Sequence, residues 1–254
     1  MHPIILKLGP ITIYSYGLMV AIAFLVGIYI AKHEAIRKGI KIDLVYNLTF
    51  YLVIGSLTGA RLYYLLFFDP SSFIKEPVSI FKVWQGGLAI HGAILSGIIT
   101  GYVFSEFHKI SFWKLADLLA PSIILGQAIG RIGCFLNGCC SGIPTGSIFG
   151  IRFPEGSLPY PAYKNLPVHP TQLYELFFNL IGFFILWSMR KRLKFDGGLF
   201  LLYLVMYNCT RIVISSLRYD SLYIWNTDLK IAQVISGLIC AVSIVLFIKR
   251  QKSA

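Results

Sequence analysis

The strongest constraint on the fold is a series of seven apolar segments that recur along the chain. A helix needs about 20 predominantly apolar residues to cross roughly 30 Å of hydrocarbon. The segments have about this length and lie at 12–31, 44–68, 86–104, 112–131, 170–189, 197–215 and 230–248. Because lipid offers no partners to backbone polar groups, segments that cross it are expected to be helices.

The composition supports the same reading. Of the 254 residues, 56% are hydrophobic and only 13% are charged, whereas soluble domains carry about 25% charged residues. We therefore predict an all-α, polytopic integral membrane protein. It would have about seven transmembrane helices in a single transmembrane domain covering residues 1–254.

The net charge of +12 raises the question of nucleic acid as a partner. The basic residues lie in short connections between apolar segments, and no basic soluble segment is present, so we expect no nucleic-acid partner. Lysine and arginine are densest at 32–41, 109–114, 190–194 and 249–252. The positive-inside rule then predicts that these connections face the cytoplasm, with the N-terminus outside and the C-terminus in the cytoplasm.

The long connection 132–169 falls on the outer side in this topology. It is rich in proline and glycine, so we expect an irregular extracytoplasmic loop that forms a head insertion within the transmembrane domain. Long loops in compact proteins are more often functional than idle.

Ionisable side chains inside apolar segments are costly in lipid and are therefore candidate functional residues. The arginines and histidines of this kind are Arg61, His91, Arg131 and Arg211, with His169 at a segment mouth. The predicted topology places all five in the outer half of the membrane. Arginines there suit a phosphate group, which a guanidinium binds with two hydrogen bonds, and a histidine beside them is a candidate general base.

Each of these residues also has a plain structural interpretation. An arginine near a helix end often extends to the interface, and a membrane histidine is often a hydrogen-bonded packing residue. The glycines around His91 in "GGLAIHGAILSG" permit either close helix approach or access for a ligand. From the residues alone, the argument reaches an enzyme or transporter that acts on an anionic phospholipid.

Four blocks resemble, in order, those of the prolipoprotein diacylglyceryl transferases. They read "GGLAIHGAILSG" (86–97), "GRIGCFLNGCCSG" (130–142), "HPTQLYELFFN" (169–179) and "GLFLLYLVMYNCTRIVISSLR" (198–218). The opening "LGPITIYSYGLM" (8–19) is also similar to the start of that family. The resemblance covers essentially the whole chain.

The resemblance implies transfer of the diacylglyceryl group of phosphatidylglycerol to the cysteine thiol of a prolipoprotein lipobox, with release of glycerol-1-phosphate. The partners would be phosphatidylglycerol, prolipoprotein signal peptides and the lipid bilayer of the bacterial cytoplasmic (inner) membrane. The active site would lie near the outer leaflet.

The resemblance also suggests roles for individual residues. His91 would be the base, and Arg131 and Arg211 would bind the headgroup and stabilise the departing phosphate. The other expected substrate-binding residues are Tyr16, Asn137, Gly142, Tyr207 and Arg61. The expected supporting residues are Asp117, His169, Gln172, Tyr174, Glu175 and Arg218. Asp117 falls at the cytoplasmic end of its segment, which favours a capping role, and Glu175 within a segment calls for an arginine partner.

The chain departs from the family pattern at three positions. Cys134 stands where the family has asparagine, and Cys139 and Ser215 stand where it has glutamate. The chain is thus either a divergent transferase or a relative with altered substrate or activity; we favour the first. The alternative function is a non-catalytic phospholipid-binding or transporting membrane protein.

The three cysteines of the second block, Cys134, Cys139 and Cys140, allow several interpretations. Small packing residues at a helix end are favoured, and a disulfide is an alternative on an oxidising side of the membrane. A metal site is the least favoured because no spaced second ligand pair is present. We therefore expect no cofactor and no metal.

Overall fold

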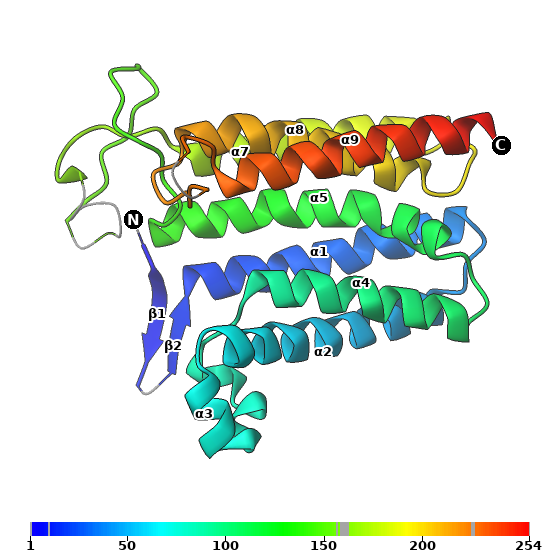
Figure 1. Cartoon of the computed structure of the whole chain (residues 1–254), viewed down its shortest axis with the longest axis horizontal. Helices are drawn as coiled ribbons and strands as arrows, with labels where there is room; N and C mark the ends of the chain where they lie inside the picture. Colours follow the sequence, from blue (N-terminus) through cyan, green and yellow to red (C-terminus); the bar gives the residue numbers. More distant parts are fainter. Residues whose placement is uncertain (1, 10, 156, 158–162, 225–226, 254) are drawn as a thin grey trace. The chain divides into compact units, whose positions relative to one another are not determined.

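The computed structural model describes residues 2–9, 11–155, 157, 163–224 and 227–253. Within them, seven helices are long and apolar enough to cross a membrane, which confirms the predicted fold class (Figure 1). They are α1 (Ser15–Arg37), α2 (Ile42–Phe67), α4 (Ile90–Phe107), α5 (Phe112–Asn137), α7 (Thr171–Met189), α8 (Gly198–Leu217) and α9 (Ile231–Lys252).

The first predicted segment differs from the structure at its start. Residues 12–14 belong to an antiparallel hairpin of β1 (Ile4–Leu8) and β2 (Ile11–Tyr14), and α1 begins only at Ser15. The hairpin turns at Gly9, which has a φ of 57°. Such a backbone conformation suits glycine. Both the amide and the hydroxyl of buried Ser15 donate to the carbonyl of Pro3, which fixes the hairpin to the first turn of the helix.

The chain forms two compact units, one of residues 1–31 with 117–254 and the other of residues 32–116. The second unit is built on α2 and α4, joined by α3 (Pro70–Lys75) and the 3₁₀ turns η1 (Pro77–Phe81) and η2 (Val83–Gln85). A Cβ atom on Gly92 would lie only 2.3 Å from the carbonyl oxygen of Gly59. The close helix approach that the glycines around His91 permit is therefore present.

The helix that carries His91 starts later than predicted, at Ile90 rather than at residue 86. Gly86 and Gly87 have φ values of 82° and 65°. These left-handed conformations cannot continue a right-handed helix, so the first four residues of the predicted segment form an irregular approach to it.

The first unit contains α7, α8 and α9 together with the hairpin and most of α1 and α5. Its core includes Ala120 and Ile124 of α5, Leu186 of α7, and Leu199 and Tyr203 of α8. Buried Asp117 accepts hydrogen bonds from the amides of Gly197 at 2.9 Å and Phe200 at 2.8 Å. These amides lie at the start of α8, where helices leave donors unsatisfied, so Asp117 caps that helix.

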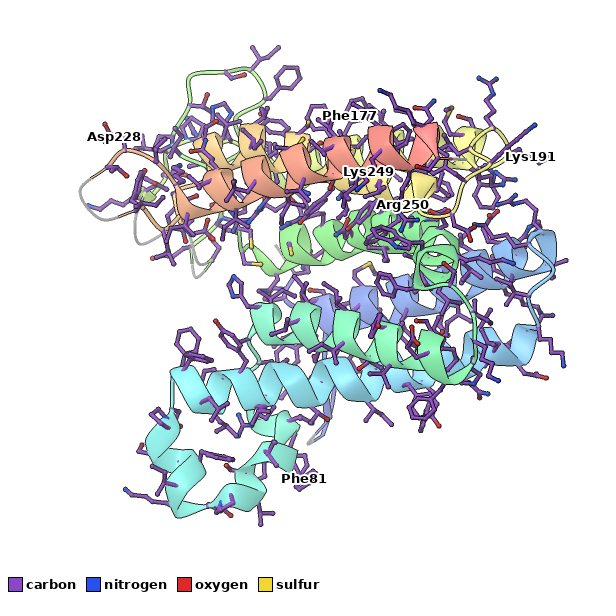
Figure 2. The ribbon with its side chains drawn as sticks, turned by 45° about the vertical axis from the view of Figure 1, so that its right-hand side comes forward. Phe81, Phe177, Lys191, Asp228, Lys249 and Arg250 are labelled. Atoms are coloured by element: carbon purple, nitrogen blue, oxygen red, sulfur yellow. The ribbon has the colours of Figure 1, made fainter. Side chains whose placement is uncertain are left out.

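Large apolar side chains cover much of the outer surface of the helices. Phe177 of α7 and Phe81 of η1 are 61% and 70% exposed and are labelled in Figure 2. Soluble monomers rarely expose apolar surface on this scale, whereas helices in a bilayer present it to lipid acyl chains. The exposure agrees with a multi-pass membrane protein.

Candidate active site

Glu175 of α7 is the centre of a buried group of charged residues in the first unit. Its side chain is 3% exposed, and its Oε2 atom lies 2.5 Å from Nη2 of Arg131 on α5. Its Oε1 atom accepts a hydrogen bond from Nη1 of Arg211 at 3.2 Å and lies 3.7 Å from Nη1 of Arg218. We call Arg131, Arg211 and Arg218 the arginine cluster. The expectation that Glu175 pairs with an arginine is confirmed.

The arginine cluster lies at the C-terminal ends of α5 and α8. The prediction that the fourth segment ends at Arg131 is wrong, because α5 continues to Asn137 and carries Arg131 in its last two turns. Arg211 occupies the last two turns of α8, and Arg218 is the C-cap residue of that helix. All three arginines therefore lie within two turns of the C-terminal ends of their helices, and Arg218, at the cap, lies where the backbone dipole favours a cation.

The charges of this group do not cancel. Arg218 also forms a two-point contact with Asp220, at 2.8 and 2.5 Å, so three guanidiniums face two carboxylates. Although burial acts against it, these carboxylates raise the pKa of Arg218, which stays charged. The side chains of Arg131 and Arg211 remain 17% and 24% exposed. The cluster therefore presents residual positive charge to a ligand, the arrangement that binds a phosphate.

The residues of "HPTQLYE" support this end of the unit. The buried side chains of Thr171 and Gln172 each donate a 2.6 Å hydrogen bond, to the carbonyls of Cys140 and Cys139 respectively. The imidazole Nδ1 of His169 lies 3.3 Å from the hydroxyl of Tyr174. The start of α7 thereby holds the turn that follows α5, and the same helix supplies Glu175 one turn later.

The turn after α5 has a defined geometry. Gly138 adopts a φ of 71°. The amide of Cys139 donates a hydrogen bond to the carbonyl of Cys134, and the amide of Gly138 donates one to the carbonyl of Phe135. This is the Schellman ending of a helix, which brings together the side chain three residues before the cap residue, Asn137, and the side chain two residues after it. Cys134 and Cys139 occupy these two positions, so their contact is a direct consequence of the helix ending.

The thiols of Cys139 and Cys140, which follow the end of α5, differ in acidity. Hydrogen bonds from Cys134 and Cys139, together with the charges of Arg218 and Arg131, lower the pKa of Cys140. For Cys139, a hydrogen bond with Cys134 acts to lower the pKa, but the contact with Cys140 and burial outweigh it and raise the pKa. A thiolate in this group therefore forms first at Cys140.

Gly142 holds the connecting segment against the end of α8. Its amide donates to the carbonyl of His169 at 2.8 Å, and it forms a bridge with Arg218. A Cβ atom at this position would lie 2.7 Å from both the Cβ atom of His169 and the carbonyl oxygen of Leu217. Glycine at this position permits the backbone approach that places Arg218.

Tyr16 and Tyr207, two further expected substrate-binding residues, also lie in this unit. Tyr16 is 46% exposed in the first turn of α1, and Gly133 of α5 packs against its backbone. Tyr207 stacks on Tyr203, whose hydroxyl accepts a 3.0 Å hydrogen bond from Gln127. Asn137 ends α5 and contacts the Cys139 thiol.

Lys230 was not identified from the sequence. It is buried, and its ammonium donates to the carbonyls of Ser215 at 2.8 Å, Arg218 at 2.9 Å and Ser216 at 3.2 Å. These carbonyls lie at the end of α8, where the backbone dipole favours a cation such as Lys230. A lysine immediately before an apolar segment resembles an interfacial anchor, so the sequence carried no signal for this role.

His91 and Arg61 belong to the second unit. His91 is exposed in the first turn of α4, with its ring 6.1 Å from that of Tyr63. Arg61 is buried and donates to the carbonyls of Ser79 at 3.1 Å and of Gly86 at 2.7 Å. These hydrogen bonds fix the irregular segment before α4, so Arg61 binds backbone carbonyls in this structure.

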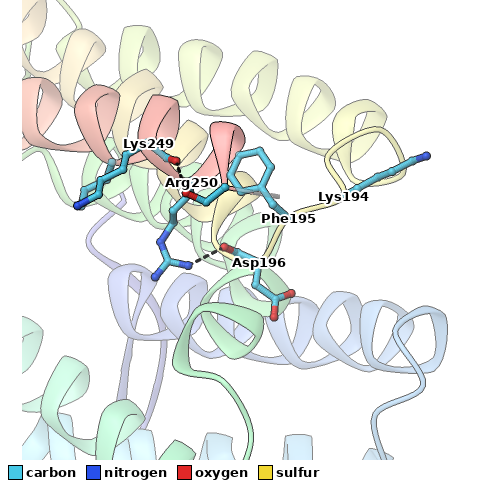
Figure 3. A pocket seen from close by; sticks show the side chains of 7 residues that line it. Lys194, Phe195, Asp196, Lys249 and Arg250 are labelled. Carbon is cyan, nitrogen blue, oxygen red and sulfur yellow. Dashed lines mark hydrogen bonds between the residues drawn. The ribbon is translucent and has the colours of Figure 1, made fainter.

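A shallow pocket in the first unit lies at the other end of α8, some 20 residues from Arg218, and is separate from the arginine cluster (Figure 3). Arg250 there donates a 3.2 Å hydrogen bond to the carbonyl of Asp196. The pocket is lined by Lys194, Phe195, Asp196, Leu246, Lys249, Arg250 and Ser253.

Comparisons with known proteins identify the family of this chain. The family model of the prolipoprotein diacylglyceryl transferases matches residues 3–249. A phosphatidylglycerol–prolipoprotein diacylglyceryl transferase of Geobacillus kaustophilus is 42% identical, over 98% of this chain and 92% of its own. Proteins of the same name from a Nostoc species and from Fusobacterium nucleatum are 41% and 39% identical, covering 92% and 98% of this chain and 84% and 98% of their own. The chain therefore belongs to the prolipoprotein diacylglyceryl transferase family.

Proposed function

We propose that this protein is a transferase that moves the diacylglyceryl group of phosphatidylglycerol to the lipobox cysteine thiol of prolipoproteins and releases glycerol-1-phosphate. The observation that carries the proposal is the arginine cluster. Three guanidiniums from two helix ends surround one buried carboxylate, and two of them remain partly exposed. The names of the relatives indicate the same two substrates.

The reaction needs one bond to form and one to break. The thiolate sulfur attacks the carbon of the diacylglyceryl group that is esterified to the phosphate. The bond between this carbon and the phosphate oxygen breaks, and its electron pair leaves with that oxygen in glycerol-1-phosphate. The products are a thioether and a phosphate monoester with increased negative charge. Positive groups fixed at the phosphate stabilise this charge as it develops.

The arginine cluster suits this task. Arg131 and Arg211 would bind the phosphoglycerol headgroup through charge-assisted hydrogen bonds, while Glu175 holds both side chains in place. Tyr16, Asn137 and Tyr207 would line the same binding region, and Gly142 would shape it by close backbone approach. Arg218 would act mainly in support, since it already forms a two-point contact with Asp220.

His91 would accept the proton of the incoming thiol. The support for this role is the family block around it and its exposed position in the first turn of α4. A thiol has a pKa near 8.5 and is mostly protonated at neutral pH, so a base would increase the fraction of the reactive thiolate.

Seven spanning helices and the family support a multi-pass protein of a bacterial membrane. We further propose that the N-terminus lies outside, the C-terminus lies in the cytoplasm and the arginine cluster lies near the outer leaflet. A membrane-impermeant maleimide would test the orientation in a variant without native cysteines. Ile148→Cys, at a 92% exposed position, should be labelled in intact cells, and Lys191→Cys should be labelled only after lysis.

The function is tested by incubating the purified protein with phosphatidylglycerol and a synthetic lipobox peptide, followed by mass spectrometry. The expected result is a peptide whose mass is increased by one diacylglyceryl group, with glycerol phosphate released in equal amount. A Cys→Ser lipobox peptide is the matched control. Binding of phosphatidylglycerol without any adduct would instead support the non-catalytic alternative.

A further inference from the structure

Three cysteine thiols meet beside the arginine cluster. The Sγ atoms of Cys134, Cys139 and Cys140 lie within 4.8 Å of one another, and all three residues are partly buried. Three sulfurs around a zinc ion, with bonds of about 2.3 Å, lie roughly 3.8 Å apart. Small side-chain rotations would therefore bring these thiols to the geometry of a metal site.

The backbone of all three residues is held before any ligand arrives. The Schellman ending joins Cys139 to Cys134, and the side chains of Gln172 and Thr171 hold the carbonyls of Cys139 and Cys140. Cys140 has a φ of 63°, a left-handed conformation that is unfavourable for a residue with a Cβ atom. Residues in this conformation persist only where their surroundings impose it, as the bond from Thr171 does here.

The surrounding charges suit a site with net negative charge. The carboxylates of Glu175 and Asp220 are engaged by guanidiniums, and the arginine cluster as a whole holds more guanidiniums than carboxylates. Three thiolates and a divalent cation together carry one negative charge, which the arginines can accommodate. Sulfur ligands select soft d¹⁰ cations over magnesium or calcium.

We propose that Cys134, Cys139 and Cys140 form a three-thiolate site for a soft d¹⁰ cation of the zinc class, with a fourth position open to water. Sequence spacing disfavoured a metal because it offered no separated second ligand pair. The helix ending and the start of α7 supply the arrangement that the spacing does not show. The site is a structural feature of this chain and does not depend on the transfer reaction.

Binding is tested on the purified, fully reduced protein with Cd²⁺ and Zn²⁺ alone. Cd²⁺ should produce sulfur-to-metal charge-transfer absorption at one equivalent, and Zn²⁺ should displace it. Maleimide labelling with mass spectrometry should show Cys134, Cys139 and Cys140 protected by the metal. Cys134→Ser, Cys139→Ser and Cys140→Gly should each weaken binding at least tenfold.

Two matched variants keep the result interpretable. Cys209→Ser and Cys240→Ser remove the other close pair of thiols, with sulfurs 3.7 Å apart on α8 and α9, and should leave binding unchanged. Cys140→Gly removes a ligand at a position where glycine suits the backbone, so the loss of binding should occur in a protein that folds normally.

Three outcomes would overturn the proposal. The first is full metal binding in Cys140→Gly, and the second is loss of binding in the Cys209→Ser and Cys240→Ser variants. The third is a reduced protein that takes up no metal, either because its three cluster thiols stay free and are labelled or because two of them close a disulfide instead.

Discussion

The carboxylate of Glu175 lies 2.5 Å from the guanidinium of Arg131, and this contact joins α7 to α5 inside the first unit. The second oxygen of the carboxylate is shared by Arg211 and Arg218 at 3.2 and 3.7 Å. Glu175 and Asp220 together cannot neutralise three guanidiniums, so Glu175 orders the arginines while positive charge remains for a phosphate. Glu175 is thus a positioning residue for the proposed headgroup site.

The variant Glu175→Gln should lose both stability and transfer activity. Removing one partner of a buried ion pair typically costs about 3–5 kcal/mol, and the partial exposure of the arginines places the expected cost at roughly 2–4 kcal/mol. Transfer should fall at least tenfold in kcat, because the arginines would no longer be held in one geometry.

Thermal unfolding in detergent and single-turnover assays measure the two effects. Glu175→Asp, which keeps the charge on a shorter side chain, should recover part of the stability. A Glu175→Gln protein with normal kcat and unchanged unfolding temperature would show that the carboxylate does not position the arginines.

The variant Gln172→Ala should loosen the turn after α5. The carbonyl of Cys139 would lose its 2.6 Å hydrogen bond, and an unsatisfied buried carbonyl costs about 1–3 kcal/mol. We expect lower thermal stability and faster maleimide labelling of Cys139. Ser188→Ala, an exposed change on the same helix, is the control and should alter neither measurement. Unchanged labelling in Gln172→Ala would contradict the role of this side chain.

Sequence reasoning identified the helices and the residue types of the site better than their exact positions. Seven apolar segments were sufficient to predict the seven helices, because only helices satisfy the backbone within lipid. The hairpin before Ser15 was missed because its alternating apolar residues continue directly into the first apolar segment. Arg131 was placed too close to a helix end, because the cysteines and glycines after it resemble a loop, whereas α5 continues to Asn137.

The site itself was predictable in part. An acidic residue in an apolar segment requires a cationic partner, so the pairing of Glu175 with an arginine could be expected from the sequence. Two features could not be expected, because they depend on where backbone carbonyls point in three dimensions. Lys230 satisfies the end of α8, and the buried Arg61 holds the backbone before α4.

The thiol of Cys140 should react with iodoacetamide over an unusually wide pH range. Its lowered pKa means that, at a given pH below about 8, a larger fraction of it is ionised than of an ordinary thiol. An ordinary thiol, with a pKa of about 8.5, loses roughly tenfold in rate for each pH unit below that value. Between pH 8 and 6 the labelling rate of Cys140 should therefore fall less steeply than that of an ordinary thiol.

Labelling followed by peptide mass spectrometry, on metal-free protein, gives this profile. Cys139, whose pKa is raised, is the internal comparison and should label slowly throughout. If Cys140 loses rate in parallel with free glutathione, the arginines and neighbouring thiols do not stabilise its thiolate.

The variant His91→Gln should lose most of its transfer activity at neutral pH. A general base contributes about 10²–10⁴ to the rate. Raising the pH toward 9 should recover part of the activity, because the substrate thiol then ionises without help. Full activity with an unchanged pH profile would remove His91 from the chemistry. A loss without recovery at high pH would instead assign it to lipid positioning or folding.

The arginine cluster is the central claim, and the most direct measurement is the transfer kinetics of Arg131→Ala and Arg131→Lys with phosphatidylglycerol and a lipobox peptide. Loss of one charge-assisted phosphate contact costs about 3 kcal/mol, so Arg131→Ala should fall roughly a hundredfold or more in kcat/KM. Arg131→Lys should recover only part of it, because an ammonium cannot form the two-point contact. Arg152→Ala, at an exposed arginine outside the cluster, should be unaffected. A folded Arg131→Ala protein with near-normal kcat/KM would contradict the account.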